Sequence, residues 1–394
     1  MTIATVTRKS GSKIVADLLG VVPKRWATSA ADASSNSSIK TSIAGRSRFY
    51  KQVGIKSLNV PWDATSDTNG NDNVKSPISA GVDGTQSATG VHHIPLDNDT
   101  ISLIKMLKPR CPGVEYNDDN NKDDNNNNNN NNNDSDNCWY GVTLDGRKLS
   151  TPMGQTLVVP SETLAMMIAA EWDSQLKQIQ PSNMPLMTLA CTTLDQAALH
   201  PKHYRDEAIN FLRTDTTCFL ADPTEDRLLH RRQKQAWQGL HDFCCDRLGG
   251  SSPTTALGIE GILMTRKRGS EKPQTGLPHP EILTELATKW IYSLDAWQLV
   301  ALNSIANQAK SFLIAFAILE SNGINISNNE SSGVVACPFP DITKVSEACR
   351  VEEEFQISCW GLVEGGHDYD RLNCNIQLQS ANLFSKTILL ENEY

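Results

Sequence analysis

Apolar and polar residues alternate in the N-terminal half of the chain, as they do in half-buried β-strands. The second of these stretches is followed by Asp145-Gly146, a dipeptide typical of tight turns between antiparallel strands. Two shorter stretches lead into Pro152 and Pro160, which favour strand ends. The pattern therefore predicts a small antiparallel sheet built from hairpins. Its strands are expected at residues 48–53, 139–144, 148–151 and 156–159.

The pattern changes to helical spacing after Pro160. Ser161 is a suitable N-cap, and Leu164, Ile168 and Trp172 then recur on one face of a helix. The run Phe312–Leu319 is apolar on every side, which predicts a buried central helix. Residues 254–264 fit a strand or a loop equally well. The remaining helices are expected at residues 204–212, 226–248, 280–292, 296–320, 342–360 and 371–390.

Two predicted strands are separated by a stretch of unusual composition. It contains nine consecutive Asn residues, at 125–133, with Asp residues on both sides. A polar tract of this kind cannot bury enough apolar surface to offset the entropy of an ordered chain. We therefore predict a disordered insertion at 57–137, in which Ile101–Leu107 forms no more than a transient helix. Long insertions are tolerated in loops because the entropy of closure grows slowly with length.

The first 47 residues have a different character again. They are rich in Ser, Thr and Ala and carry seven basic and two acidic residues. This composition is typical of an organelle transit peptide and does not distinguish a mitochondrial from a plastid address. The alternative is a disordered N-terminus without an address. The predicted organisation is a disordered transit peptide at 1–47, a sheet-containing domain at 48–200 and a helical domain at 201–394.

Charge and cysteine content narrow the possible functions. The chain has 394 residues and a net charge of −9, and without the basic leader the remainder carries −14. Such an acidic body argues against a nucleic-acid binder, whose affinity comes from clustered Lys and Arg. The longest uncharged apolar run has eight residues, whereas a membrane span needs about 20, so we expect a soluble protein. Ten Cys without a CxxC pair are typical of buried thiols in a reducing compartment.

The common signatures of catalysis and of cofactor binding do not occur. The chain has no GxxxxGK[ST] or GxGxxG loop, no GxSxG elbow and no HExxH helix. His241 and Cys244 share a helix face, which fits two zinc ligands or, more simply, a helix with small buried thiols. Two ligands do not complete a zinc site. We therefore expect no catalytic residue, no metal and no cofactor.

The acidic run Glu352–Glu354 is the strongest candidate for chemistry or recognition. One hypothesis is a hydrolase that uses Glu352 or Glu354 together with His367. Two titratable groups in different environments can divide the roles of general acid and general base. The simplest alternative is a solvated helix face, since consecutive helical residues point about 100° apart. With Gln356 and Trp360 nearby, the run also has the composition of a surface that recognises basic partners, either one partner or, in a general acidic scaffold, several.

A second group of residues suggests a structural role. Trp172 ends an apolar helix face, where a tryptophan is usually part of the core. Arg213 and Asp215 lie close together in the sequence with short polar neighbours, and they fit a polar knot between helices.

Short sequence blocks follow one another in a fixed order along the chain. The blocks are Arg48-Phe49-Tyr50, Leu144–Arg147 with Thr151-Pro152, Leu157–Pro160, Ala170–Gln175, Met184-Pro185-Leu186, Leu194-Asp195, Leu212–Thr216 with Asp222, Gln233 with Gln235 and Trp237, and Glu352–Gln356 with Trp360-Gly361, Glu364 and His367-Asp368-Tyr369. Together they resemble the family of mitochondrial ATP synthase assembly factors that act as chaperones of the alpha subunit of the catalytic head. The Asn-rich insertion and the tail ending at Tyr394 depart from the usual pattern of that family.

The resemblance implies an α+β fold, with a small antiparallel-sheet N-terminal domain followed by a mainly α-helical orthogonal bundle. It implies an ATP-independent assembly chaperone of the mitochondrial matrix that is not an enzyme. Such a protein binds the unassembled alpha subunit and prevents its aggregation before hexamer assembly, without nucleic acid, small-molecule substrate or membrane span. By analogy, the expected partner-binding residues are Glu352, Glu353, Glu354, Gln356, Trp360, Glu364 and Asp368, and the expected structural motif residues are Trp172, Asp173, Arg213 and Asp215.

Overall fold

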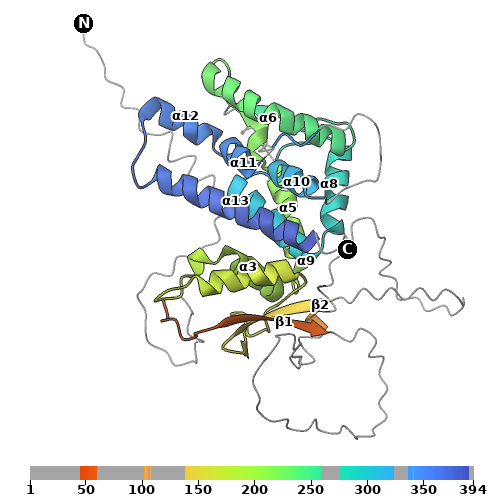
Figure 1. Cartoon of the computed structure of the whole chain (residues 1–394). Helices are drawn as coiled ribbons and strands as arrows, with labels where there is room; N and C mark the ends of the chain where they lie inside the picture. The colour runs from red at the N-terminus through yellow and green to blue at the C-terminus, as the bar shows by residue number, and fades with distance from the viewer. Residues whose placement is uncertain are drawn as a thin grey trace, which may run out of the picture. The chain divides into compact units, whose positions relative to one another are not determined.

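The computed structural model of the chain is shown in Figure 1. The predicted leader up to residue 44 and the Asn tract lie outside the residues that it describes. The described residues are 45–59, 102–104, 107, 138–258, 276–323, 336–339 and 341–389.

The sheet is centred on strand β2, Cys138–Leu144, which pairs with β1, Val53–Asn59. The two strands are antiparallel over their whole length, with Val53 opposite Leu144 and Asn59 opposite Cys138. On its other side β2 pairs with the short strands β3, Arg147–Lys148, and β4, Val158–Val159. β1 is therefore at one edge of the sheet as far as the structure describes it. Asp145 and Gly146 have φ angles of 49° and 78°, which confirms the predicted tight turn between β2 and β3.

The first strand begins later than predicted. Residues 48–52 precede the ladder, because their hydrogen-bonding groups have partners other than the main chain of β2. The carboxylate of Asp145 accepts hydrogen bonds from the main-chain N–H groups of Lys51 and Gln52, at 3.0 and 2.8 Å. The guanidinium of Arg48 donates to the carbonyl of Gln175 at 2.7 Å and to that of Asp173 at 2.9 Å. The prediction of a strand at 48–53 was therefore wrong in its position, and the chain joins the sheet only at Val53.

A layer of helices lies against the sheet. Helix α3, Glu162–Asp173, begins at the predicted N-cap, where the Ser161 side chain accepts from Leu164 N at 3.2 Å. Figure 1 shows α3 beside β1 and β2, which it contacts. The chain then continues through these elements: η1 Pro181–Asn183, α4 Pro185–Thr192, the π-helix η2 Thr193–Ala197, α5 Pro201–Arg213, η3 Thr216–Cys218, β5 Phe219–Leu220, α6 Arg227–Arg247 and β6 Ala256–Leu257.

The C-terminal part is helical, as predicted, but it has more breaks than the pattern suggested. The predicted helix 296–320 is two helices, because Lys310 adopts a left-handed conformation (φ 54°) and Ser311 caps a new helix. The predicted helix 342–360 is also broken, at Arg350. The helices are α8 Glu281–Ser293, α9 Ala296–Ala309, α10 Phe312–Ser321, α11 Ile342–Cys349, α12 Val351–Trp360 and α13 His367–Leu389.

One continuous apolar core connects the sheet with the helices. The ring centres of Trp139 on β2 and Trp297 on α9 are 6.3 Å apart, and those of Trp297 and Phe384 on α13 are 5.8 Å apart. Helix α10 is buried over almost its whole length, which confirms the predicted central helix. The predicted boundary near residue 200 falls within the part of the chain that shares this core, and the division into two domains stays a prediction. The fold class, a small antiparallel sheet followed by mostly helices, is confirmed.

The predicted insertion at 57–137 contains ordered pieces. Residues 57–59 belong to β1. Leu103, Ile104 and Leu107 are buried in the core, and the indole N–H of Trp297 donates to the carbonyl of Leu107 at 3.3 Å. These positions correct the expectation that the apolar piece 101–107 contributes nothing to the fold, because its leucine and isoleucine side chains fill core space beside α9.

Candidate functional site

The predicted partner-binding residues lie on α12, on the turn that follows it and at the start of α13. Helix α12 ends at Gly361, whose φ of 91° lies in the region that favours glycine. The turn returns the chain to α13, where the ring Nδ1 of His367 accepts from the main-chain N–H of Val363 at 3.0 Å. The structure thus brings the two ends of the predicted set together on one helix–turn–helix unit.

The three consecutive glutamates of α12 have intramolecular partners. Arg350, which is almost fully buried, donates to Glu353 at 2.8 Å. Arg371 of α13 donates twice to Glu354, at 2.8 and 2.5 Å. Glu352 accepts from the side-chain amide of Gln233 on α6 at 2.8 Å. The run therefore attaches α12 to α6 and α13 and pairs locally with its own N-cap residue, Arg350, which a solvated helix face would not do.

These contacts change the protonation of the carboxylates in different directions. The hydrogen bonds from Arg371 lower the pKa of Glu354, with smaller contributions from the nearby charges. Partial burial raises the pKa of Glu352. A general acid or base works best with a pKa near the operating pH, and the Arg371 bonds move Glu354 away from that range. The Nδ1 atom of His367 is bonded to Val363 N, and the hydrolase hypothesis stays a prediction.

Exposed apolar side chains follow the acidic run, at the end of α12, on the turn and on α13. Trp360 is 81% exposed and Val363 is 61% exposed, although both are large apolar residues. Tyr369, Leu372 and Ile376 recur at helical spacing on the outer face of α13 and are also exposed. Contiguous exposed apolar groups with a polar rim mark interaction sites. We call this the α12–α13 surface; its members are Gln356, Trp360, Leu362, Val363, Glu364, Asp368, Tyr369, Leu372 and Ile376.

Helix α6 contacts α12 and the end of α11 through polar and aromatic side chains. The guanidinium of Arg232 lies 5.2 Å from the ring centre of Phe355 and donates to Ser358 at 3.1 Å. The indole N–H of Trp237, a residue of the motif blocks, donates to the carbonyl of Ala348 at 2.9 Å. Only Val351 of α12 is buried. Helix α12 is thus held mainly by polar contacts, with little core of its own.

The predicted structural residues occupy different places in the fold. Trp172 is buried beside Tyr50, whose hydroxyl donates to the Trp172 carbonyl at 2.6 Å. Asp173 is exposed and pairs with Arg48 at 3.0 Å. Asp215 is completely buried, which raises its pKa. The side chain of Arg213 is exposed, and its carbonyl accepts from Leu277 N at 2.8 Å.

The polar knot at Asp215 lies within the helical part of the chain. Its carboxylate accepts from the hydroxyl of Thr217 at 2.7 Å, from that of Ser311 at 2.8 Å and from Leu313 N at 2.8 Å. These bonds hold η3 against the start of α10. Arg213 takes no part in them.

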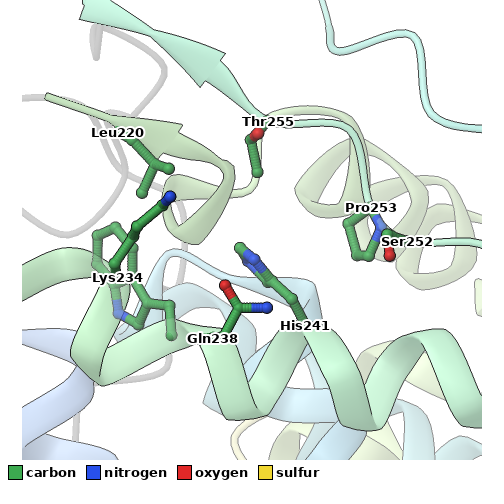
Figure 2. Close-up of a pocket in the computed structure, with 8 residues that line it drawn as sticks. Leu220, Lys234, Gln238, His241, Ser252, Pro253 and Thr255 are labelled. Atoms are coloured by element: carbon green, nitrogen blue, oxygen red, sulfur yellow. The ribbon is translucent and has the colours of Figure 1, made fainter. Parts of the chain in front are cut away.

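The suggested zinc pair does not form one site. His241 lines a pocket of about 240 Å³ between α6 and the segment that leads into β6 (Figure 2). Cys244 is fully buried, and its Sγ lies 4.0 Å from the carbonyl of Leu313. Burial raises the pKa of Cys244 well above its ordinary value, which disfavours the thiolate that binds metal. Within the described parts of the chain, no three His, Cys, Asp or Glu side chains form a group that suits a metal ion.

Sequence reasoning missed several residues that shape the surface. Arg350 precedes Glu353 by three residues and Glu354 by four. This helical spacing predicts contact between the side chains, so these ion pairs could have been found from the sequence. Arg371 follows Glu354 by 17 residues, so no local pattern indicated their contact. The exposed stripe on α13 has a 3.5-residue period, but a second apolar stripe on the same helix obscured it.

The sequence of this chain is similar to those of known proteins. A sequence profile described as ATP12 chaperone protein matches residues 125–245. Protein atp12, mitochondrial, of Schizosaccharomyces pombe is 28% identical over 254 residues, which cover 63% of this chain and 77% of that protein. Protein ATP12, mitochondrial, of Saccharomyces cerevisiae is 23% identical over 261 residues, covering 60% and 76%.

Structural comparison agrees with the sequence matches. The crystal structure of Atp12 from Paracoccus denitrificans aligns with a TM-score of 0.50 and 23% identity, covering 63% of this chain and 91% of that one. At this identity the likeness shows the fold. None of the helices that the structure describes is long and apolar enough to cross a membrane. The resemblance drawn from the motif blocks is confirmed, since the profile and both yeast relatives that the chain matches are ATP12 chaperone proteins.

Proposed function

We propose that this protein is an assembly chaperone of the mitochondrial ATP synthase that binds the unassembled alpha subunit of the catalytic head in the matrix. Similarity to ATP12 chaperone proteins supports a role in ATP synthase assembly, and the names of the yeast relatives support a mitochondrial location. The alpha subunit as partner, the prevention of aggregation, the matrix compartment and the absence of catalysis are the finer parts of the proposal.

The observation that carries the proposal is the exposure of Trp360 together with its apolar neighbours. An unassembled subunit exposes interface surface that is buried in the finished complex, and such surface aggregates. A chaperone that covers it needs an apolar face of its own with a charged rim. The α12–α13 surface offers both, with Glu364 and Asp368 exposed beside Trp360 and Tyr369.

A capture experiment tests the partner. The full chain, immobilised, is offered newly synthesised alpha and beta subunits in separate reactions without added ATP. We expect selective recovery of alpha, and at least a tenfold loss for Trp360→Ser, because aromatic residues at interfaces often contribute more than 1.4 kcal/mol. Met153→Ser is the matched control, since Met153 is 70% exposed and lies in the β3–β4 turn.

Three results would contradict the proposal. Recovery of beta in place of alpha would assign another client. Equal loss for Trp360→Ser and Met153→Ser would remove the α12–α13 surface from the argument. Capture of many unrelated basic proteins, lost at moderate salt, would favour the general acidic scaffold.

A further inference from the structure

Strand β1 has an open edge. Its inner side pairs with β2 from Val53 to Asn59, and β3 and β4 lie on the far side of β2. In the described part of the chain, no strand pairs with the outer side of β1. An edge strand presents a row of main-chain donors and acceptors to any extended segment that approaches it.

The hydrogen bonds of the sheet show which groups face outward. Asp145 N donates to Gln52 O at 2.9 Å, so Gln52 faces β2. Leu149 N donates to Val142 O at 3.0 Å, so Val142 faces away from β1. Because main-chain groups alternate along an antiparallel strand, Gly54 and Lys56 also face β2. The N–H and C=O groups of Val53, Ile55 and Ser57 therefore face the open edge.

A groove begins at the same place. It has a volume of about 530 Å³ and lies between the start of β1 and the C-terminal half of α3. Lys51, Gln52 and Val53 line one wall, and Ala169, Ala170 and Asp173 line the other. Because the two alanines have short side chains, they leave space in the groove beside α3. A groove between an edge strand and a helix is suited to an extended peptide that adds a strand to the sheet.

The charge of the sheet and its turns indicates what kind of peptide segment would bind at the open edge of β1. Residues 45–59 and 138–160, which build the sheet and its turns, contain six basic residues and one acidic residue. The acidic one, Asp145, is bonded to Lys51 N and Gln52 N. Lys51 lines the groove and Lys56 lies on β1 itself. Asp173, the acidic residue of the helix wall, pairs with Arg48 at 3.0 Å. The strand side of the groove is therefore basic and attracts an acidic segment, although the whole chain carries −9.

We propose that the outer edge of β1 captures an extended, acidic segment of a client protein by strand addition. The segment pairs with the main-chain groups of Val53, Ile55 and Ser57 and enters the groove beside Ala169 and Ala170. The proposal rests on the proposed function only in taking the segment from the client. The contact is independent of Trp360 and its neighbours, and it requires a segment that has not yet folded.

A defined peptide tests strand addition. The probe is a fluorescein-labelled ten-residue peptide of alternating Val and Thr with two Asp at each end, and its binding to the full chain is followed by anisotropy. A second peptide with the same side chains carries N-methyl groups on alternate residues, which removes the donors of one edge. We expect the methylated peptide to bind at least tenfold more weakly, and a peptide with Lys in place of Asp to bind more weakly as well.

Two variants locate the site on the protein. Ser57→Pro removes one outward-facing donor and leaves the β1–β2 ladder intact, since proline is tolerated where the N–H faces outward on an edge strand. Ser57→Ala makes a similar change to the side chain and keeps the donor. We expect Ser57→Pro to weaken probe binding and Ser57→Ala to leave it unchanged. Trp360→Ser retains probe binding if the two surfaces are separate.

Several results would overturn the proposal. The wild-type chain fails to bind the acidic probe, or it binds the methylated peptide equally well. Hydrogen exchange without probe shows the amides of Val53, Ile55 and Ser57 already protected, which assigns the edge to another segment of this chain. Loss of probe binding in Trp360→Ser assigns the probe to the α12–α13 surface. Capture of the alpha subunit is scored separately, so either proposal can fail alone.

Discussion

The sheet edge and the α12–α13 surface differ in charge and in the way they are held. Residues 351–372 contain six acidic residues and one basic residue, the reverse of the sheet region. The start of β1 rests on buried aromatic groups, with Tyr50 and Trp172 rings 5.6 Å apart. Helix α12 buries only Val351 and is held by ion pairs and amide contacts. The start of β1 is thus held by apolar packing, whereas α12 is held by polar contacts that water can replace.

This difference assigns the two surfaces different mechanical properties. A packed core tolerates little displacement, because even small voids lose contact energy. Ion pairs whose two side chains are more than a third exposed, as in Glu354–Arg371, contribute little net energy and adapt to salt and pH. We infer that the sheet edge offers a fixed template, whereas α12 adjusts to the surface of its partner. Three measurements test this contrast.

The largest effect is expected at Trp172. Trp172→Ala removes a fully buried indole and leaves a cavity under the start of β1, so the free energy of unfolding falls by about 3–5 kcal/mol. Urea denaturation followed by circular dichroism measures it. Phe49→Ala is the control, since Phe49 is a neighbouring aromatic residue that is 61% exposed, and its change stays within about 0.5 kcal/mol. A small effect at Trp172 would mean that packing does not fix the sheet region.

A smaller effect is expected from pH at Glu171, at the same end of α3. Its carboxylate accepts from Leu186 N and Met187 N, both at 2.8 Å, and so fastens the start of α4. Burial raises its pKa from 4.5 to about 7. Between these values the unfolded chain loses the proton and the folded chain keeps it, so folding stability falls as pH rises, by up to about 1.4 kcal/mol per pH unit.

The comparison with Glu171→Gln isolates this group from the other titratable groups of the chain. We expect the stability of the wild type to fall relative to that variant as the pH rises from 5 to 7. Glu354 has the opposite sign: its pKa is lowered, so its contribution is present above its ordinary pKa and is lost as the pH falls through the lowered value. A wild-type curve parallel to that of Glu171→Gln would contradict the raised pKa.

The sequence predicted element types better than contacts between distant residues. The N-cap at Ser161, the turn at Asp145-Gly146 and the buried helix around Phe316 follow from local patterns, and all three are confirmed. The break at Lys310 was not predicted, because the apolar pattern continues across it. Ser311 caps the new helix, and the buried carboxylate of Asp215, 98 residues before Leu313, accepts from Ser311 and from Leu313 N. Such a long-range bond leaves no periodic signal in the sequence.

The candidate site shows the same division. The acidic run and Trp360 stood out by composition, and the motif blocks drew attention to their segment. Their partner-binding role stays a prediction. The pairing of Glu353 with Arg350 follows from helical spacing. The pattern could not give the pairing of Glu354 with Arg371, because Arg371 approaches only when α13 folds back on α12. The exposed face of α13 was equally hidden, since exposure depends on which of its two apolar stripes the core occupies.

The smallest effect is expected for the Glu354–Arg371 pair. Both side chains are more than a third exposed, at 38% and 39%. A double-mutant cycle with Glu354→Gln and Arg371→Met is therefore expected to give a coupling energy of about 0.5–1 kcal/mol at low salt. In 1 M NaCl, where the Debye length is about 3 Å, most of it disappears. The cycle is measured by urea denaturation at both salt concentrations.

The sheet region supplies the reference for that measurement. Asp173 pairs with Arg48 at 3.0 Å and is 70% exposed, so Asp173→Asn is expected to cost less than Glu354→Gln at low salt and equally little at high salt. Arg48 keeps its bonds to the carbonyls of Asp173 and Gln175 in that variant. A coupling at Glu354 above about 2 kcal/mol that salt does not change would indicate a desolvated pair. Helix α12 would then be as fixed as the sheet, and the contrast between the two surfaces would rest on charge alone.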